Sequence, residues 1–308
     1  MTQQLQVAIG QASDRGRKPI NQDFHGAMLP RAPLLSAKGM VAAIADGVSS
    51  SDVSQVASET SVKGFLDDYY ATSEAWSVKN SAQRVLQATN SWLYSATRNG
   101  PHRYNIEKGY VCTFSALVIK SATAHIFHVG DARIYRLSGN CLEQLTDDHR
   151  QVVSPEKSYL SRALGMREGL ELDYGSHAVE PGDTFLLATD GVYEFAPQDF
   201  ITDSIRTNPM DLDHAAGLIV EEALRRGSDD NLTLQIVRVD EVPQHTIGEF
   251  QQQAAELPFP PELRPRMEID GYLIVRSLHA SARSHEFLAQ DLDSAQQVVL
   301  KTPSVDLR

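Results

Sequence analysis

Residues 112–145 read CTFSALVIKSATAHIFHVGDARIYRLSGNCLEQL, and this stretch decides the fold. It holds closely spaced runs of β-branched, aromatic and other apolar residues, which predict strands at 112–119, 124–129, 132–137 and 141–145. The connections between these runs are short and polar. This spacing predicts an antiparallel meander rather than a series of βαβ units.

The flanking sequence supplies more strands and two pairs of helices. Strands are expected at 5–10, 23–29, 40–45, 184–189 and 232–239, and helices within 53–60, 85–96, 197–207 and 212–224. Residues 146–178 are polar and irregular, which predicts a flap. Two groups of strands with helix pairs outside them predict an α+β fold, a four-layer α-β-β-α sandwich of two antiparallel sheets flanked by helices.

Composition limits the class of function. The chain of 308 residues carries a net charge of -12, which argues against nucleic acid or an anionic membrane as a partner. Its two cysteines, Cys112 and Cys141, give no sign of a disulfide, which favours a reducing compartment. The first residues lack the basic start and apolar run of a signal peptide, and no apolar stretch is long enough to span a bilayer. We therefore expect a cytoplasmic protein.

Aspartates recur where an apolar strand meets a turn. They are Asp23, Asp46, Asp131, Asp190 and Asp230. If the strand ends converge, their oxygens would suit hard cations such as Mg²⁺ or Mn²⁺, and two adjacent cations can activate a shared water for attack on phosphorus. An aspartate followed by glycine is also a common structural turn, and spacing alone leaves both interpretations open.

The ordered set of motifs carries a resemblance. The motifs are Asp14-Arg15-Gly16, Asn21-Gln22-Asp23, Ala45-Asp46-Gly47, Val129-Gly130-Asp131-Ala132-Arg133, Leu160-Ser161-Arg162-Ala163-Leu164-Gly165, Thr189-Asp190-Gly191 and Asp229-Asp230-Asn231. Together, from about residue 6 to 239, they resemble the bacterial PPM-type metal-dependent serine/threonine phosphatases. The resemblance implies hydrolysis of phosphoserine and phosphothreonine in protein substrates.

The resemblance also implies roles for single residues. Asp46 would bridge two divalent cations, Mn²⁺ or Mg²⁺, and the Gly47 carbonyl would bind the second. Asp190 and Asp230 would hold the first cation, Asp131 would belong to a third, weaker position, and Asp23 would act through coordinated water. Catalysis would depend on Asp46, Asp190, Asp230 and Lys18, which stands at the place of the family's phosphate-contacting arginine.

Departures from the family pattern motivate an alternative without catalysis. Gln22 stands where the family often has glutamate, and Lys18 supplies charge without the two-pronged geometry of arginine. No histidine follows Gly47, so no general acid is assigned. The alternatives are a non-catalytic binding or regulatory domain of the same fold and a hydrolase of small phosphoesters.

Histidines are not expected to ligate metal. His125 and His128 alternate with apolar neighbours in a predicted strand, which favours structural positions. His149 lies in the predicted flap, where it could touch substrate but is more simply a solvated loop residue.

The C-terminal part changes character. We expect a phosphatase domain at 1–240, a linker rich in proline and glutamine at 241–266, and kinase-like strands at 267–308. Short strands at 269–275, 286–289 and 297–301 resemble the start of a protein kinase, with Lys301 as the lysine that contacts nucleotide phosphates. The loop at 278–287 has no glycine, and neither a His-Arg-Asp nor an Asp-Phe-Gly motif follows, so these residues alone predict no kinase activity. The order of the two parts implies the phosphatase half of a bifunctional kinase/phosphatase, whose kinase domain could be a partner.

Overall fold

The computed structural model describes residues 4–154, 157–243, 261–281, 284–292 and 294–303. The chain divides into two compact units, 1–245 and 246–308, which are described separately. Most of the predicted linker, residues 244–260, lies outside the described residues.

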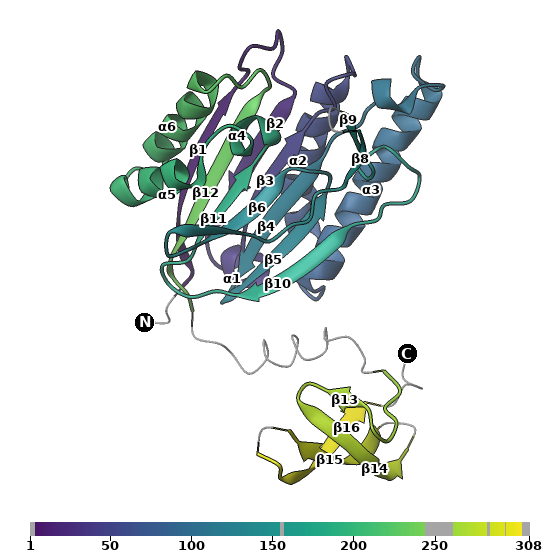
Figure 1. The fold of residues 1–308 in the computed structure, drawn as a ribbon. Helices are drawn as coiled ribbons and strands as arrows, with labels where there is room; N and C mark the ends of the chain where they lie inside the picture. The colour runs from purple at the N-terminus through teal and green to yellow at the C-terminus, as the bar shows by residue number, and fades with distance from the viewer. Residues whose placement is uncertain (1–3, 155–156, 244–260, 282–283, 293, 304–308) are drawn as a thin grey trace. The chain divides into compact units, whose positions relative to one another are not determined.

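Two five-stranded antiparallel sheets form the centre of the first unit (Figure 1). One sheet has the order β1-β12-β11-β6-β7, with bounds Gln6–Asp14, Leu232–Glu241, Thr184–Ala188, Arg133–Ser138 and Cys141–Gln144. The other has the order β10-β5-β4-β3-β2, with bounds Asp173–Ala178, Thr123–Val129, Phe114–Lys120, Met40–Asp46 and Asp23–Met28.

Helices cover the outer face of each sheet (Figure 1). The long helices α2 (Ser54–Ala71) and α3 (Val78–Asn99) pack on the β2–β5 side, and α5 (Gln198–Thr207) and α6 (Leu212–Arg225) pack on the β1–β12 side. Short elements complete the unit: α1 (Leu34–Lys38), the 3-10 turn η1 (Ile106–Lys108) and α4 (Asp190–Tyr193). The predicted α+β sandwich of four layers is confirmed.

Three apolar cores hold the layers together. Ile44, Leu117 and Phe185 belong to the core between the sheets, while Phe65 and Ile219 belong to the two cores beneath the helices. Strands in the middle of such a sandwich are buried on both faces, so they read as continuous apolar runs rather than alternating ones. Residues 40–45 of β3 are accordingly all buried, which makes the strand end at Asp46 a rigid base for a functional group.

The predicted single meander is wrong at one connection. β4 pairs with β5 and β6 pairs with β7, but β5 and β6 belong to different sheets. The chain crosses between the sheets at Gly130, whose φ of 114° favours glycine, and a Cβ there would lie 2.5 Å from the Thr113 Cβ. The crossing places Asp131 at the boundary between the sheets.

The predicted flap is only partly irregular. It contains the hairpin β8 (Arg150–Ser154) and β9 (Lys157–Leu160), but residues 173–178 form β10, an edge strand paired with β5. These residues are half-exposed and polar, as is usual at a sheet edge, so their sequence lacks the apolar signal of a central strand.

The second unit is a small antiparallel sheet. Its strands in order are β13 (Glu268–Ile269), β14 (Tyr272–Ala280), β15 (Ser284–Asp291) and β16 (Gln297–Pro303), around a core of Leu263, Ile274, Phe287 and Ala289. The strands predicted at 286–289 and 297–301 are present and longer than expected, whereas the one predicted at 269–275 is interrupted by the turn at 270–271 between β13 and β14. Within the described part of the chain, no helix combines the length and the apolar character needed to cross a membrane.

Candidate active site

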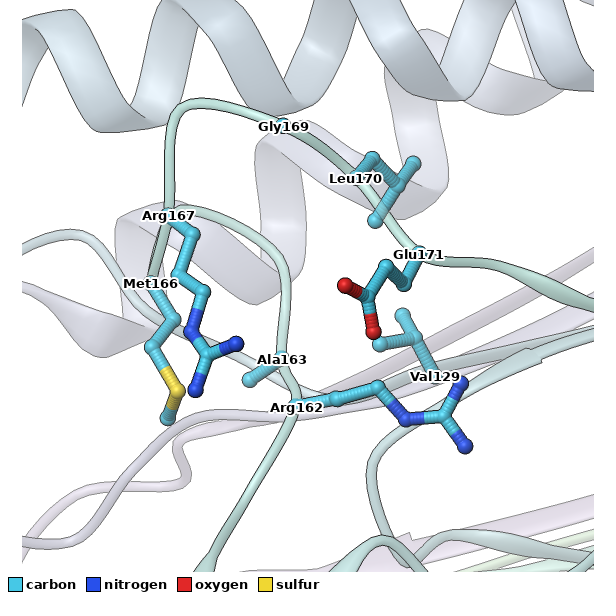
Figure 2. A pocket seen from close by; sticks show the side chains of 8 residues that line it. All are labelled: Val129, Arg162, Ala163, Met166, Arg167, Gly169, Leu170 and Glu171. Carbon is cyan, nitrogen blue, oxygen red and sulfur yellow. The ribbon is translucent and has the colours of Figure 1, made fainter.

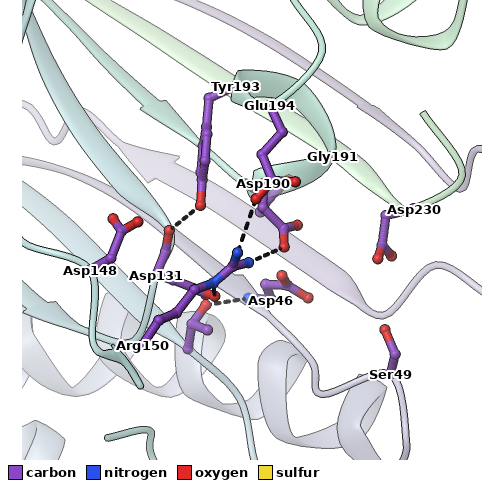
Figure 3. Close-up of polar contacts among 12 residues, drawn as sticks. Asp46, Ser49, Asp131, Asp148, Arg150, Asp190, Gly191, Tyr193, Glu194 and Asp230 are labelled. Atoms are coloured by element: carbon purple, nitrogen blue, oxygen red, sulfur yellow. Dashed lines mark hydrogen bonds and ion pairs between the residues drawn. The ribbon is translucent and has the colours of Figure 1, made fainter. Parts of the chain in front are cut away.

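Four of the predicted aspartates surround one pocket. Asp46 ends β3, Asp131 follows β5, Asp190 begins α4 directly after β11, and Asp230 lies just before β12. All four, with Gly47, line a cavity of about 640 Å³. Figure 3 shows the four aspartate side chains. The two sheets therefore bring together acidic groups that lie far apart in the sequence.

Asp46 contributes to the pocket from the end of β3. Burial raises the pKa of its carboxyl well above the ordinary value, and repulsion from Asp23, Asp190 and Asp131 raises it further. Its neighbour Gly47 packs so closely that a Cβ would lie 2.9 Å from the Gln22 carbonyl oxygen and from Ser54. Glycine is thus required at 47 by the close approach of two chain segments, and the strand end is fixed.

Asp23 is buried behind the pocket rather than in its lining. Its Oδ2 accepts hydrogen bonds from Thr189 Oγ1 at 2.9 Å and Thr233 Oγ1 at 2.7 Å. Its buried Oδ1 has no hydrogen-bond partner among the described residues. Burial raises the pKa of Asp23 to about 6, although the two threonine hydroxyls lower it. A carboxylate held in this way lacks a donor or a cation on one oxygen.

Gln22, the predicted departure, has a structural role. Its Nε2 donates to Ser51 O at 2.7 Å and to Ser54 Oγ at 2.6 Å, and its backbone N–H donates to Asn231 Oδ1 at 2.8 Å. These bonds tie the loop before β2 to the start of α2 and to the loop before β12. Gln22 thus holds together the segments that carry Asp23, Asp46 and Asp230.

Two cationic side chains reach the acidic groups. Lys18 Nζ lies 3.2 Å from Asp230 Oδ1 and 3.3 Å from Ser49 Oγ, at the side of the pocket. Arg150 extends from β8 between Asp131, Asp190 and Glu194 (Figure 3). The sequence interpretation included Lys18 but missed Arg150, because an arginine in a polar flap carries no pattern that relates it to distant strand ends.

His149 contradicts its interpretation as a solvated loop residue. The side chain is buried, its Nδ1 accepts a hydrogen bond from Gly130 N at 3.0 Å, and its Nε2 donates to Asp173 Oδ2 at 2.9 Å. Its backbone N–H also donates to Gly130 O at 2.7 Å. His149 therefore fastens the start of the flap to the sheet crossing. His125 and His128 are buried in β5, as predicted for structural positions.

A much smaller pocket is lined by Val129 of β5 and by flap residues between 162 and 171 (Figure 2). Its volume is about 10 Å³, which is room for one water molecule. Arg162 at its edge pairs with Asp173 at 2.7 Å, while Met166 and Arg167 line both pockets. Of these two pockets, the larger has space for a phosphorylated side chain.

The donor set fits divalent cations in its chemistry. Four aspartates and Glu107 are among the residues that line the pocket. Burial and mutual repulsion raise the pKa of Asp46, and burial with repulsion from Asp131 raises that of Asp190 to about 7. Such a cluster is stabilised by hard cations that prefer oxygen ligands. As the side chains lie, no three His, Cys, Asp or Glu residues of the described ranges are grouped around a common metal position. Arg150 and Lys18 neutralise part of the cluster.

Comparisons with known proteins identify the family. The family described as Protein phosphatase 2C matches residues 11–229, so the chain belongs to the protein phosphatase 2C, or PPM-type, family. The serine/threonine phosphatase stp of Listeria monocytogenes is 26% identical over 248 residues, which are 74% of this chain and 94% of that protein.

Solved structures show the same fold. The PPM Ser-Thr phosphatase MsPP of Mycobacterium smegmatis, in complex with cacodylate, is 25% identical with a TM-score of 0.62, over 76% of this chain and 97% of that one. The catalytic domain of the serine threonine protein phosphatase PstP, in complex with two manganese ions, is 23% identical with a TM-score of 0.63, over 77% and 100%. The share of this chain that is covered corresponds in extent to the first unit.

Proposed function

We propose that the first unit removes phosphate from phosphoserine and phosphothreonine in proteins, with two divalent cations, Mn²⁺ or Mg²⁺. The observation that carries the proposal is the convergence of Asp46, Asp131, Asp190 and Asp230 on one pocket of about 640 Å³. Membership of the protein phosphatase 2C family and the likeness to the Listeria serine/threonine phosphatase support it.

In this proposal Asp46 would contact both cations, with the Gly47 carbonyl, Asp190 and Asp230 completing the ligands. When bound, the cations would activate a water for attack on phosphorus and screen the phosphate charge from the carboxylates. Asp23, behind Asp46, would orient a water or a ligand through its unpartnered Oδ1. Asp131 would serve a third, weaker position.

Lys18 is proposed to attract the phosphate. Its ammonium group lies beside Asp230 and Ser49, both of which line the pocket. An ammonium supplies a point charge, so it would attract a phosphate oxygen without fixing its orientation as an arginine does. Release of the serine or threonine alkoxide requires a proton, and no side chain is assigned to supply it.

The direct test is hydrolysis of a phosphothreonine peptide with added Mn²⁺. We expect turnover that EDTA abolishes and Mn²⁺ restores, and that Asp46→Asn reduces by about a thousandfold or more, because metal-ion catalysis is lost. Asp203→Asn is the matched control, since Asp203 is an exposed residue of α5 whose carboxylate pairs with Arg206 on the same helix. Activity that survives EDTA would contradict the proposal. Faster hydrolysis of small phosphoesters than of peptides would favour the small-molecule alternative, and metal binding without turnover would favour the regulatory one.

We also propose that the second unit is the opening sheet of a kinase-like lobe, so that the phosphatase would act beside its own kinase domain. The support is the run of antiparallel strands β14, β15 and β16, with Lys301 on the last and paired with Glu286 at 3.3 Å. The encoding gene tests this. A His-Arg-Asp motif followed by Asp-Phe-Gly downstream of codon 308 would support the proposal, and a stop codon or unrelated sequence there would contradict it.

A further inference from the structure

Arg150 is the one arginine of the described chain whose guanidinium contacts three different carboxylates. Its Nε contacts Asp131, its Nη2 lies 2.5 Å from Asp190 Oδ2, and its Nη1 lies 2.9 Å from Glu194 Oε1 (Figure 3). A guanidinium stays charged at all accessible pH values and offers its donors in a rigid plane. One side chain thus supplies positive charge to three acidic groups at once.

The contacts change the charge balance of the aspartates. Burial raises the pKa of Asp131, and Arg150 opposes that rise by both charge and hydrogen bonding. The same opposition acts at Asp190, where burial and repulsion from Asp131 raise the pKa. The Arg150 side chain is 25% exposed and that of Asp131 only 7%, so the pair is shielded from competing water.

The backbone holds Arg150 in this position. The preceding residue, His149, is bonded to Gly130 through both its backbone and its imidazole, and its carbonyl accepts from Ser161 N at 2.8 Å. Gly130 directly precedes Asp131. These bonds anchor the flap at His149, immediately before Arg150 and close to Asp131, the aspartate that Arg150 contacts.

The contacts of Arg150 involve only some of the acidic residues at the pocket. Its ion pairs join it to Asp131, Asp190 and Glu194, whereas Asp230 pairs with Lys18 at the side of the site. The proposed function gives Asp131 to a third, weaker cation and Asp190 to the main pair, and Arg150 contacts both of these carboxylates. The Arg150 guanidinium and a divalent cation cannot both lie between these two carboxylates, because they would overlap in space and their positive charges would repel each other.

We propose that Arg150 is a built-in cation that takes the third metal position, so that this protein binds two divalent ions and admits a third only when the arginine moves away. The inference rests on the proposed two-ion function. In this proposal Arg150 is a positioning residue that keeps Asp131 and Asp190 in place without a third metal. Because Arg150 belongs to the flap, the position of the flap would determine how many ions bind.

Calorimetric titration of the full chain with Mn²⁺, after removal of bound metal, tests the proposal without relying on activity. Wild-type protein should bind two ions per chain, and Arg150→Met should bind a third at least about tenfold more tightly than wild type does. Arg133→Met is the matched control. Arg133 is similarly exposed at 27% and is also ion-paired, but its two-pronged pair is with Asp148, which lies outside the proposed ligand set. Its stoichiometry should equal that of wild type.

Circular dichroism would show whether Arg150→Met folds, since loss of the guanidinium leaves buried carboxylates unpaired. If it does not fold, Arg150→Lys is the comparison, because an ammonium cannot contact all three carboxylates and the third ion should bind with intermediate affinity.

Two ions in wild type and an unchanged third-site affinity in the variant would overturn this inference alone. Three equally tight ions in wild type would also overturn it. No binding in either protein would overturn the two-ion proposal and this inference with it.

Discussion

Thr113 holds the backbone of Asp46 from both sides. The Asp46 N–H donates to Thr113 Oγ1 at 2.9 Å, and the Thr113 N–H donates to the Asp46 carbonyl oxygen at 2.7 Å. Thr113 is buried just before β4, and its side chain also packs under Gly130 at the sheet crossing. One residue therefore supports the positions of both Asp46 and Asp131.

Replacing Thr113 by valine should distinguish the contribution of the hydroxyl group, which accepts the hydrogen bond from Asp46, from the contribution of side-chain packing. Valine keeps the shape of threonine but leaves the buried Asp46 N–H without an acceptor, which costs about 1–3 kcal/mol of stability. We expect a lower free energy of unfolding in urea and weaker Mn²⁺ binding. Thr113→Ser keeps the hydroxyl and should retain most of the metal affinity. Equal metal affinities in the valine and serine variants would show that the hydroxyl does not position Asp46.

Asp23 predicts a pH dependence of the metal-free protein. Its pKa rises from 3.8 to about 6 on folding, so the folded state binds the proton more tightly than the unfolded state. The stability that Asp23 contributes when protonated is therefore lost as the pH rises from about 4 to 6.

The side chain introduced by Asp23→Asn is neutral at every pH, so this variant does not lose stability in that way as the pH rises. In EDTA, the free energy of unfolding of Asp23→Asn relative to wild type should increase by roughly 1–3 kcal/mol between about pH 4.5 and pH 7. Urea titrations at the two pH values measure the difference. A constant difference would show that Asp23 titrates normally in the folded protein.

Gly130 and Gly217 form a matched pair of glycine replacements. Gly130→Ala places a Cβ against Thr113 at a φ of 114°, which costs about 1–3 kcal/mol in backbone strain before the contact is counted. Gly217 lies inside α6, and an added methyl group would meet nothing within 4 Å, so Gly217→Ala should stabilise by roughly 0.5–1 kcal/mol. Thermal unfolding of the two variants should move in opposite directions, and the same direction for both would refute the assignment of strain to the crossing.

Lys18 should influence substrate binding more than the chemical step. Removal of its charge in Lys18→Met should raise KM for a phosphopeptide by about tenfold, which corresponds to roughly 1.4 kcal/mol, with a smaller fall in kcat. Lys18→Arg restores the charge and adds a second donor, so KM should return to the wild-type value or below. A fall in kcat at constant KM would instead place Lys18 in the chemical step.

The layers and most of the elements could be predicted from the sequence, because buried strands and amphipathic helices leave direct apolar patterns. The aspartates at the ends of β3, β5 and β11 could also be recognised, since turns after apolar strands stand out. Strand pairing across Gly130 could not be predicted, because a short connection fits a hairpin as well as a crossing between sheets.

The remaining surprises depend on tertiary contacts. β10 is polar because it lies at an edge, and His149 is buried because Gly130 and Asp173 offer it partners across the fold. Arg150 reaches its carboxylates only once the flap has folded back over the sheet ends. Local sequence patterns do not predict such contacts between segments that are distant in the sequence.

The crossing at Gly130 has a mechanical consequence. Asp46 belongs to one sheet, while Asp190 and Asp230 adjoin strands of the other, and Asp131 sits on the chain between them. An ion shared by Asp46 and Asp190 would be a cross-link between the two halves of the sandwich. Metal loading would then resist sliding of one sheet over the other and stiffen the protein far from the place where the ion binds.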